Sequence, residues 1–269
     1  MDIMAIIIAC LVVGITGLIM GLLLGVAGKA FQVEVNEKEV LVREVLPGSN
    51  CGGCGYAGCD ALAEAIAKGE APANGCPVGG AAVAAKVAQI MGTDVSTIKK
   101  VAFVKCKGDC EAAPVNYEYH GNTSCREAIF VTGGGPKKCS YGCMGFGSCV
   151  DVCDFDAISI VNGIAYVDRE KCVSCGKCVK ACPKNLIELI PYDSRVHVQC
   201  NSKDKGVAVK ASCANGCIGC KLCEKNCKFD AIHVEDNIAH IDYEKCINCG
   251  VCAMKCPTKA IEKIEKKKQ

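Results

Sequence analysis

Hydrophobic and polar positions divide the chain into segments of sharply different character. Residues 3–28 form an uninterrupted run without a charged residue, between Asp2 and Lys29. About 20 apolar residues cross a ~30 Å hydrocarbon layer as a helix, so this run predicts a transmembrane helix. A cleaved signal peptide is the alternative, but it would begin with positive charge and have a shorter apolar core. We therefore expect a retained anchor over residues 1–28.

The charges beside this run predict its orientation. Positive residues follow it, at Lys29, Lys38 and Arg43, which favours an outer N-terminus and a cytoplasmic remainder. The chain is therefore expected to be a single-pass protein of the cell (inner or plasma) membrane with a cytoplasmic soluble part. Because cytoplasmic thiols stay reduced, dense cysteines there indicate metal ligands rather than disulfides.

Short helix patterns come after the anchor. A charged connector covers about 30–48, and Ala-rich stretches at 59–69 and 80–92 each end at a glycine, which is typical of helix ends. We expect these segments to form one small α-rich domain, residues 29–93.

The rest of the chain contains a repeat. Residues 153–190 and 227–264 match each other without a gap. Each copy predicts two short strands around a two-residue turn, Asn162-Gly163 or Asp236-Asn237, and then a cysteine run before a helical turn. Such a repeat predicts an array of like units, here with a small α+β fold.

Composition narrows the function. The chain has 26 cysteines and 29 glycines but no tryptophan, and its aromatic content is 5%. This composition suggests that metal cross-links, more than a large apolar core, hold the soluble part together. A net charge of +2 gives no basic or acidic field, so nucleic-acid binding is not expected. No catalytic nucleophile, acid–base dyad or dinucleotide motif is evident, so chemistry beyond electron transfer is assigned to partners.

The α-rich domain carries one cysteine motif. Its spacing is C-x2-C-x4-C-x16-C, with glycines between the first three cysteines. Four thiolates in a three-plus-one arrangement suit a [4Fe–4S] cluster, whereas zinc more often uses two C-x2-C knuckles. The ligands are Cys51, Cys54, Cys59 and Cys76.

The repeat carries the ferredoxin run C-x2-C-x2-C-x3-C. In two-cluster ferredoxins the fourth cysteine of a run ligates the other cluster. This crossover predicts three ligand sets, which are Cys172, Cys175, Cys178 with Cys153; Cys217, Cys220, Cys223 with Cys256; and Cys246, Cys249, Cys252 with Cys227.

One further site lacks a thiolate. It has Cys143, Cys149 and Cys182, but Phe146 stands where its counterpart run has Cys220. Either Cys139 supplies the fourth ligand, which we favour because it lies four positions from Cys143, or the site holds a three-iron cluster or none. Five clusters are expected in total.

Beyond the anchor, which contains Cys10, five cysteines lie outside these sets. The segment FVKC ending at Cys106 resembles HVQC ending at Cys200, so the repeat begins there, with twenty extra residues in the first copy. Cys106, Cys110 and Cys125 either join Cys139 or another thiolate in a sixth cluster, or are reduced structural cysteines. Cys200 and Cys213 complete the remainder.

The anchor, the first cysteine motif and the ferredoxin runs together resemble one family over the whole chain, the B subunit of the Rnf ion-translocating oxidoreductase complex. The stretch from HVQCNSKDKG to CANGCIGCKLC is similar to versions from anaerobes such as clostridia. The resemblance implies [4Fe–4S] ligands at the motifs above. It also implies electron uptake from reduced ferredoxin, and partners that include integral membrane subunits and a flavin-bearing subunit that reduces NAD, coupled to Na⁺ or H⁺ transport.

The expected organisation is an anchor, a [4Fe–4S] domain and two tandem ferredoxin modules. Two other functions are compatible with the motifs, an electron-input subunit of another membrane dehydrogenase or hydrogenase, and a zinc scaffold without redox activity. The expected boundaries are 1–28 for the anchor, 29–93 for the [4Fe–4S] domain, 94–135 for a linking region, and 136–192 and 193–269 for the modules.

Overall fold

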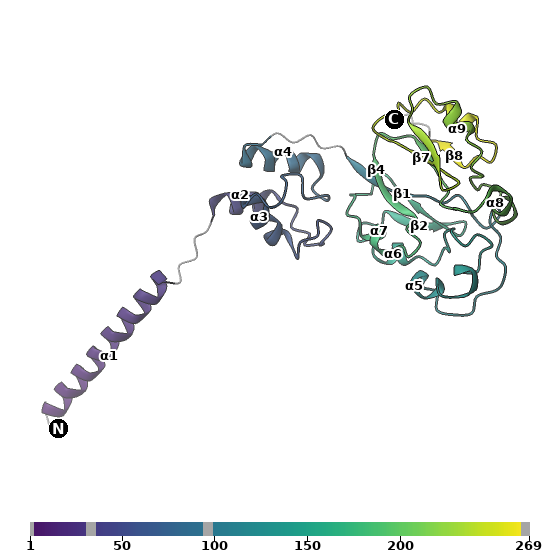
Figure 1. Cartoon of the computed structure of the whole chain (residues 1–269). Helices are drawn as coiled ribbons and strands as arrows, with labels where there is room; N and C mark the ends of the chain where they lie inside the picture. Colours follow the sequence, from purple (N-terminus) through teal and green to yellow (C-terminus); the bar gives the residue numbers. More distant parts are fainter. Residues whose placement is uncertain (1–2, 31–35, 94–98, 265–269) are drawn as a thin grey trace.

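The computed structural model describes the backbone of residues 3–30, 36–93 and 99–264. Side chains are described for the same residues except at positions 3, 5, 6, 9, 10, 28 and 30. An N-terminal helix, a helical domain and two small α+β units follow one another along the chain (Figure 1).

The first helix, α1 (Ile3–Ala30), stands apart from the other elements in Figure 1. Its described large apolar side chains are exposed; Leu24, for example, is 72% exposed. Among the residues whose side chains are described, no helix is long and apolar enough to cross a membrane.

The helical domain packs three helices around one apolar core. They are α2 (Glu37–Val45), α3 (Cys59–Ala67) and α4 (Gly80–Met91). The Asn36 side chain caps α2 by accepting a hydrogen bond from the Lys38 N–H, and Gly92 ends α4 in a left-handed conformation. Both helices predicted from Ala-rich stretches are confirmed. The charged connector is part of the folded domain, because it forms α2 and buries Val42 completely in this core.

The first α+β unit, module 1, spans residues 99–192. Its outer strands β1 (Lys100–Val104) and β4 (Ile187–Pro191) pair antiparallel, as do β2 (Ile158–Val161) and β3 (Ile164–Val167). The boundary expected at residue 136 moves upstream, because β1 lies within the segment interpreted as a linking region. The short helices are α5 (Cys125–Ala128), the 3-10 turn η1 (Thr132–Gly134), α6 (Ser148–Asp151) and α7 (Lys177–Ala181).

The second unit, module 2, spans residues 193–264 and repeats this arrangement. Strand β5 (Val196–Val198) pairs with β8 (Ile261–Lys263), and β6 (Ile232–Glu235) pairs with β7 (Ile238–Ile241). The two predicted hairpins are therefore confirmed, one in each module. The helices of module 2 are α8 (Gly206–Ser212), α9 (Leu222–Lys225) and α10 (Val251–Met254).

The two modules lie side by side, as the adjacent teal and yellow-green parts of Figure 1 show, and equivalent positions of the repeat meet between them. The ring of Phe103 in β1 lies 4.6 Å from that of His197 in β5, and the Lys107 N–H donates to the Gln199 carbonyl. His197 is fully buried, and burial together with nearby Arg169 lowers its pKa to about 4. This packing brings the segments after β1 and β5 into contact.

Candidate metal centres

Cysteines gather around five cavities of about 300–410 Å³, and each cavity is lined by four of them. Three of the five have the cysteine sets expected from spacing. They are Cys51, Cys54, Cys59 and Cys76; Cys153, Cys172, Cys175 and Cys178; and Cys227, Cys246, Cys249 and Cys252.

The arrangement of these cysteines fits a cluster better than a single ion. A tetrahedral zinc site needs four donors about 2.0–2.3 Å from one point. Among the described residues, no group of three or more His, Cys, Asp or Glu side chains could hold one metal ion. A cubane instead spreads four thiolates over its irons. Four cysteines around an open cavity therefore fit a [4Fe–4S] cluster.

Local backbone geometry shapes the ring in the helical domain. Gly52 and Gly55 have φ values of 67° and 91°, which let the chain turn tightly between Cys51 and Cys59. The Asn50 side chain accepts a hydrogen bond of 2.7 Å from the N–H of Cys59, where α3 begins. The Gly79 N–H donates to the Cys76 sulfur at 3.4 Å. The loop and the start of α3 thus present three sulfurs to the cavity, and the segment before α4 presents the fourth, that of Cys76.

Backbone N–H groups also face sulfurs in the modules. Ala102 of β1 donates to Cys172 at 3.3 Å, and Leu186 donates to Cys182 at 3.4 Å. Such hydrogen bonds stabilise a ligating thiolate and help to set the potential of a bound cluster. Because Ala102 belongs to the segment expected to be a linker, β1 contributes directly to a candidate site.

In the set that has Phe146 in place of a cysteine, a fourth cysteine lies beside the other three, and it is not the one expected from the sequence. The structure places Cys125 beside Cys143, Cys149 and Cys182, around a cavity of about 410 Å³. The interpretation that Cys139 fills this role is corrected, because Cys139 lines a different cavity.

The twenty extra residues of the first copy explain how Cys125 takes the place of the cysteine that Phe146 replaces. This insertion carries α5, which begins at Cys125, and the Cys125 N–H donates to the Ser148 hydroxyl at 3.0 Å. The same insertion carries Tyr119, whose ring lies 5.3 Å from that of Phe146. One segment therefore supplies both the fourth thiol and a packing partner for the aromatic ring. No spacing rule identifies Cys125, although its place in an insertion present in only one copy was a usable signal.

The counterpart site in module 2 keeps a complete run. Burial and the neighbouring thiols of Cys217 and Cys220 raise the pKa of Cys223 to about 12. Cys256, the crossover ligand expected from the run, packs against the same apolar cluster as Cys217 and Cys223.

The remaining cavity, of about 350 Å³, is lined by Cys106, Cys139, Cys200 and Cys213. The grouping of Cys106, Cys110 and Cys125 considered from sequence is not found, because Cys125 belongs to the Phe146 site. Cys110 is exposed and lines none of the five cavities.

Burial controls the charge of these thiols. It is the largest cause that raises the pKa of Cys149 and of Cys178 to about 12, and neighbouring cysteines add to the effect. Thiols with such pKa values stay protonated at neutral pH unless a cation compensates the thiolate charge. Iron supplies that charge, so binding of a cluster releases protons from these sites.

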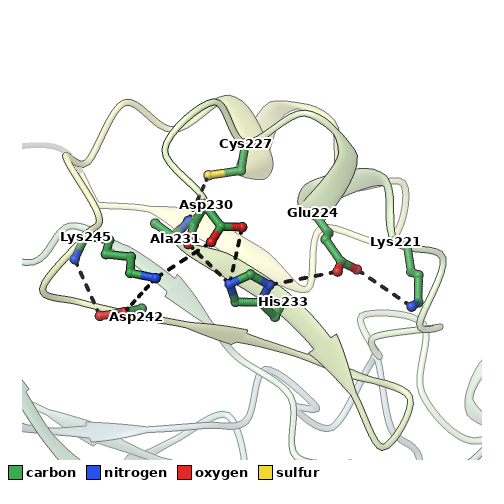
Figure 2. A network of polar contacts seen from close by, with 8 residues as sticks. All are labelled: Lys221, Glu224, Cys227, Asp230, Ala231, His233, Asp242 and Lys245. Carbon is green, nitrogen blue, oxygen red and sulfur yellow. Dashed lines mark hydrogen bonds and ion pairs between the residues drawn. The ribbon is translucent and has the colours of Figure 1, made fainter.

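A polar network lies beside Cys227 in module 2 (Figure 2). His233 lies between Glu224 and Asp230, at 3.9 Å and 3.6 Å, and the Ala231 N–H donates to the Cys227 sulfur at 3.4 Å. Exposed ion pairs contribute at most about 1 kcal/mol each, so the network orders this loop more than it stabilises the fold. Its other members are Lys221, Asp242 and Lys245.

Comparison with known families agrees with the positions of these sites. Residues 46–78 match the family described as "Putative Fe-S cluster". Residues 165–188 and 239–262 match the "4Fe-4S binding domain" family, and a second family of that description matches 214–230. The chain therefore contains 4Fe–4S binding domains in both modules.

Three relatives are similar over most of the chain. The B subunit of the Na(+)-translocating ferredoxin:NAD(+) oxidoreductase complex from Acetobacterium woodii is 51% identical over 93% of this chain and 75% of its own length. The B subunit of the proton-translocating ferredoxin:NAD(+) oxidoreductase complex from Clostridium ljungdahlii is 48% identical, covering 94% and 90%. The B subunit of the ion-translocating oxidoreductase complex from Methanosarcina acetivorans is 44% identical, covering 91% and 94%. The chain thus belongs to the family of B subunits of Rnf-type ion-translocating oxidoreductase complexes.

Proposed function

We propose that this chain is the electron-relaying B subunit of an ion-translocating ferredoxin:NAD oxidoreductase complex. The observation that carries the proposal is the succession of four-cysteine cavities through the helical domain and both modules. The names of the relatives support the ferredoxin and NAD partners and the transport of Na⁺ or H⁺.

Five [4Fe–4S] clusters are assigned to cysteine sets. When bound, each cluster takes up and releases one electron at a time. The protein contributes the thiolates, the N–H donors that face them and the apolar packing that keeps water away. Four sets are those expected from spacing, and the fifth is Cys125, Cys143, Cys149 and Cys182.

The helical domain touches module 1 close to two of these sets. A Cβ atom built on Gly53 would lie 2.8 Å from the Cys175 carbonyl oxygen and 3.1 Å from its Cβ. Gly53 lies between Cys51 and Cys54, so the lack of a side chain lets the two ligand loops approach closely. We assign this contact as the route for electrons between the helical domain and module 1.

Module 2 offers the most open approach to a soluble electron carrier. Cys220 and Cys249 are the exposed members of their sets. The run that contains Cys249 also exposes apolar side chains, with Ile247 57% exposed and Met254 77% exposed. We propose that reduced ferredoxin docks here and delivers electrons to module 2.

We further propose that α1 is a retained single-pass anchor that holds the cytoplasmic part at the membrane. The uncharged run from Ile3 to Gly28 and the ion-translocating complexes of the relatives support this. Deletion of residues 1–28 should move the chain from the membrane fraction to the soluble fraction with its iron retained. Recovery of the full chain in the soluble fraction without partners would contradict the anchor.

The test of function mixes the anaerobically purified chain with reduced ferredoxin and follows the visible absorption of the clusters. We expect rapid bleaching that recovers when an oxidant is added. Addition of NAD should give no NADH, because we assign the nucleotide site to another subunit. Failure to exchange electrons with ferredoxin, or steady NAD reduction by this chain alone, would refute the proposal.

A further inference from the structure

The cavity between the two modules has the features of the other cysteine sites. Its volume of about 350 Å³ falls within the 300–410 Å³ range of the others. Cys106, Cys200 and Cys213 are buried, and Cys139 is half-buried. A Cβ atom on Gly108 of module 1 would lie 3.4 Å from the sulfur of Cys213 in module 2 and 3.6 Å from that of Cys106. The cavity is therefore a junction between modules.

Each module contributes the same two positions to this cavity. Cys106 follows β1 by two residues, and Cys200 follows β5 by two residues. Cys139 lies four positions before Cys143, as Cys213 lies four positions before Cys217. Two equivalent pairs thus face each other, which explains why Cys213 is present in the copy that needs no replacement ligand.

Backbone groups around the sulfurs repeat in the same way. Cys106 accepts hydrogen bonds from the N–H groups of Gly108 at 3.4 Å and of Cys143 at 3.3 Å. At Cys200, backbone groups of Cys217 and Ser202, the counterparts of Cys143 and Gly108, lie beside the sulfur. Donors placed at two equivalent sulfurs are the arrangement that stabilises ligating thiolates.

A buried cation supports an anionic occupant. Lys137 is only 5% exposed, and its ammonium donates to the carbonyls of Gly108 and Gly163 at 2.8 Å. Half-buried Lys184, which lines the neighbouring Cys125 cavity, donates to the carbonyl of Gly142, a residue that lines the junction cavity, at 3.0 Å. In the part of the chain that the structure describes, no carboxylate pairs with either lysine. Buried charges are normally paired, and a thiolate-ligated cluster carries net negative charge.

We propose that Cys106, Cys139, Cys200 and Cys213 hold a further [4Fe–4S] cluster at the junction of the modules. Its ligands touch the neighbouring sets, because the N–H of Cys143 donates to the Cys106 sulfur and the backbone of Cys217 faces Cys200. A cluster held by these four cysteines would carry single electrons between the sets on its two sides. It therefore joins the two modules into one relay, and this role rests on the proposed function.

The test uses the full-length chain purified anaerobically, with iron, zinc and sulfide measured per chain. At four irons per cubane, six clusters bring about 24 irons and five bring about 20. The double variant Cys106→Ser/Cys200→Ser should lose about four irons and the corresponding electron spin resonance signal of the reduced protein. Cys110→Ser is the matched control, because Cys110 lies outside the cavity and its loss should leave the iron content unchanged.

Three results would overturn the inference. They are a parent chain with about 20 irons, equal iron content in the double variant and the parent, or loss of zinc in place of iron. If the double variant loses all its iron, it has failed to fold, and the single variant Cys213→Ser then tests the site. It should convert one cluster to a three-iron form, and an unchanged spectrum would refute the site. Iron content does not depend on ferredoxin exchange, so failure of the proposed function would be seen separately.

Discussion

At the scale of single residues, replacement of one ligand shows how a repeat can diverge without losing a site. Phe146 removes a thiol from the cysteine run, and Cys125 restores the count from a segment that the other copy lacks. The exchange couples two changes, because the new aromatic ring also needs Tyr119 as a neighbour. Phe146 without the insertion would leave the set with three cysteines and the Phe146 ring without Tyr119 beside it.

Cys125→Ser should therefore damage one cluster. We expect a three-iron form or loss of that cluster, which is a fall of about one to four irons per chain. Phe146→Cys in the Cys125→Ser background should recover the iron, because it restores the complete run. Iron analysis with electron spin resonance measures both effects. Unchanged iron in Cys125→Ser would show that the site does not use this thiol.

A second prediction at this scale concerns His197. Its folded-state pKa of about 4 lies below the ordinary value of 6.5, so the folded protein binds fewer protons than the unfolded chain between these values. The stability contribution of neutral His197 is present above pH 6.5 and is lost as the pH falls toward 4. The loss is about 2 kcal/mol at pH 5.

His197→Phe, which copies the equivalent Phe103, should remove this pH dependence. The readout is amide hydrogen exchange in β5 at pH 7 and pH 5, which reports the free energy of local opening. His240→Phe is the control, because His240 is exposed and should not change the slope. An equal pH slope in the parent and in His197→Phe would contradict the assignment.

At the scale of elements, the strands define the modules more than the cysteine runs do. Strand β1 pairs with β4 over five residue pairs and buries Val101, Ala102, Phe103 and Val104 in the core of module 1. Cysteine spacing alone draws the module boundary after this strand. The pairing shows that a segment far upstream of the ligands is part of the unit that holds them.

Two truncated chains test this boundary. A chain that begins at residue 99 should fold with all module clusters, whereas one that begins at residue 105 lacks β1 but keeps Cys106. Complete burial of one Val or Phe side chain stabilises by about 1.5–3 kcal/mol, so loss of the strand removes a large share of a typical 5–15 kcal/mol. Soluble yield and iron per chain provide the measurement. Equal yields of the two chains would show that β1 is dispensable.

At the scale of the whole molecule, the separate units are joined by close contacts between ligand loops. Gly53 meets Cys175 where the helical domain touches module 1, and Cys106 accepts a hydrogen bond from Cys143 at the junction cavity. Electron relay requires such proximity, while each unit keeps its own apolar core. The contacts between ligand loops therefore matter to the relay as much as the fold of each unit.

Gly53→Val tests the first of these contacts. The added side chain would overlap the Cys175 backbone, so the loops must separate while each cysteine set stays intact. We expect unchanged iron content and slower electron exchange between the cluster of the helical domain and the others, measured by freeze-quench spin resonance. Gly53→Ala should give a smaller effect in the same direction. Unchanged kinetics in Gly53→Val would mean that electrons do not use this contact.

Local spacing along the sequence is enough to predict the sets in which three cysteines lie within a few residues, such as Cys172, Cys175 and Cys178. A short loop can place such ligands around one cluster whatever the rest of the chain does. The sequence also determined the hairpins and the helices of the helical domain, because local patterns and turn residues specify them. Folding in three dimensions is needed to bring Cys125 to Cys143, Cys149 and Cys182, and to bring Cys106 and Cys139 to Cys200 and Cys213. Those ligands come from an insertion and from the other module, so strand pairing and packing between the modules bring them together.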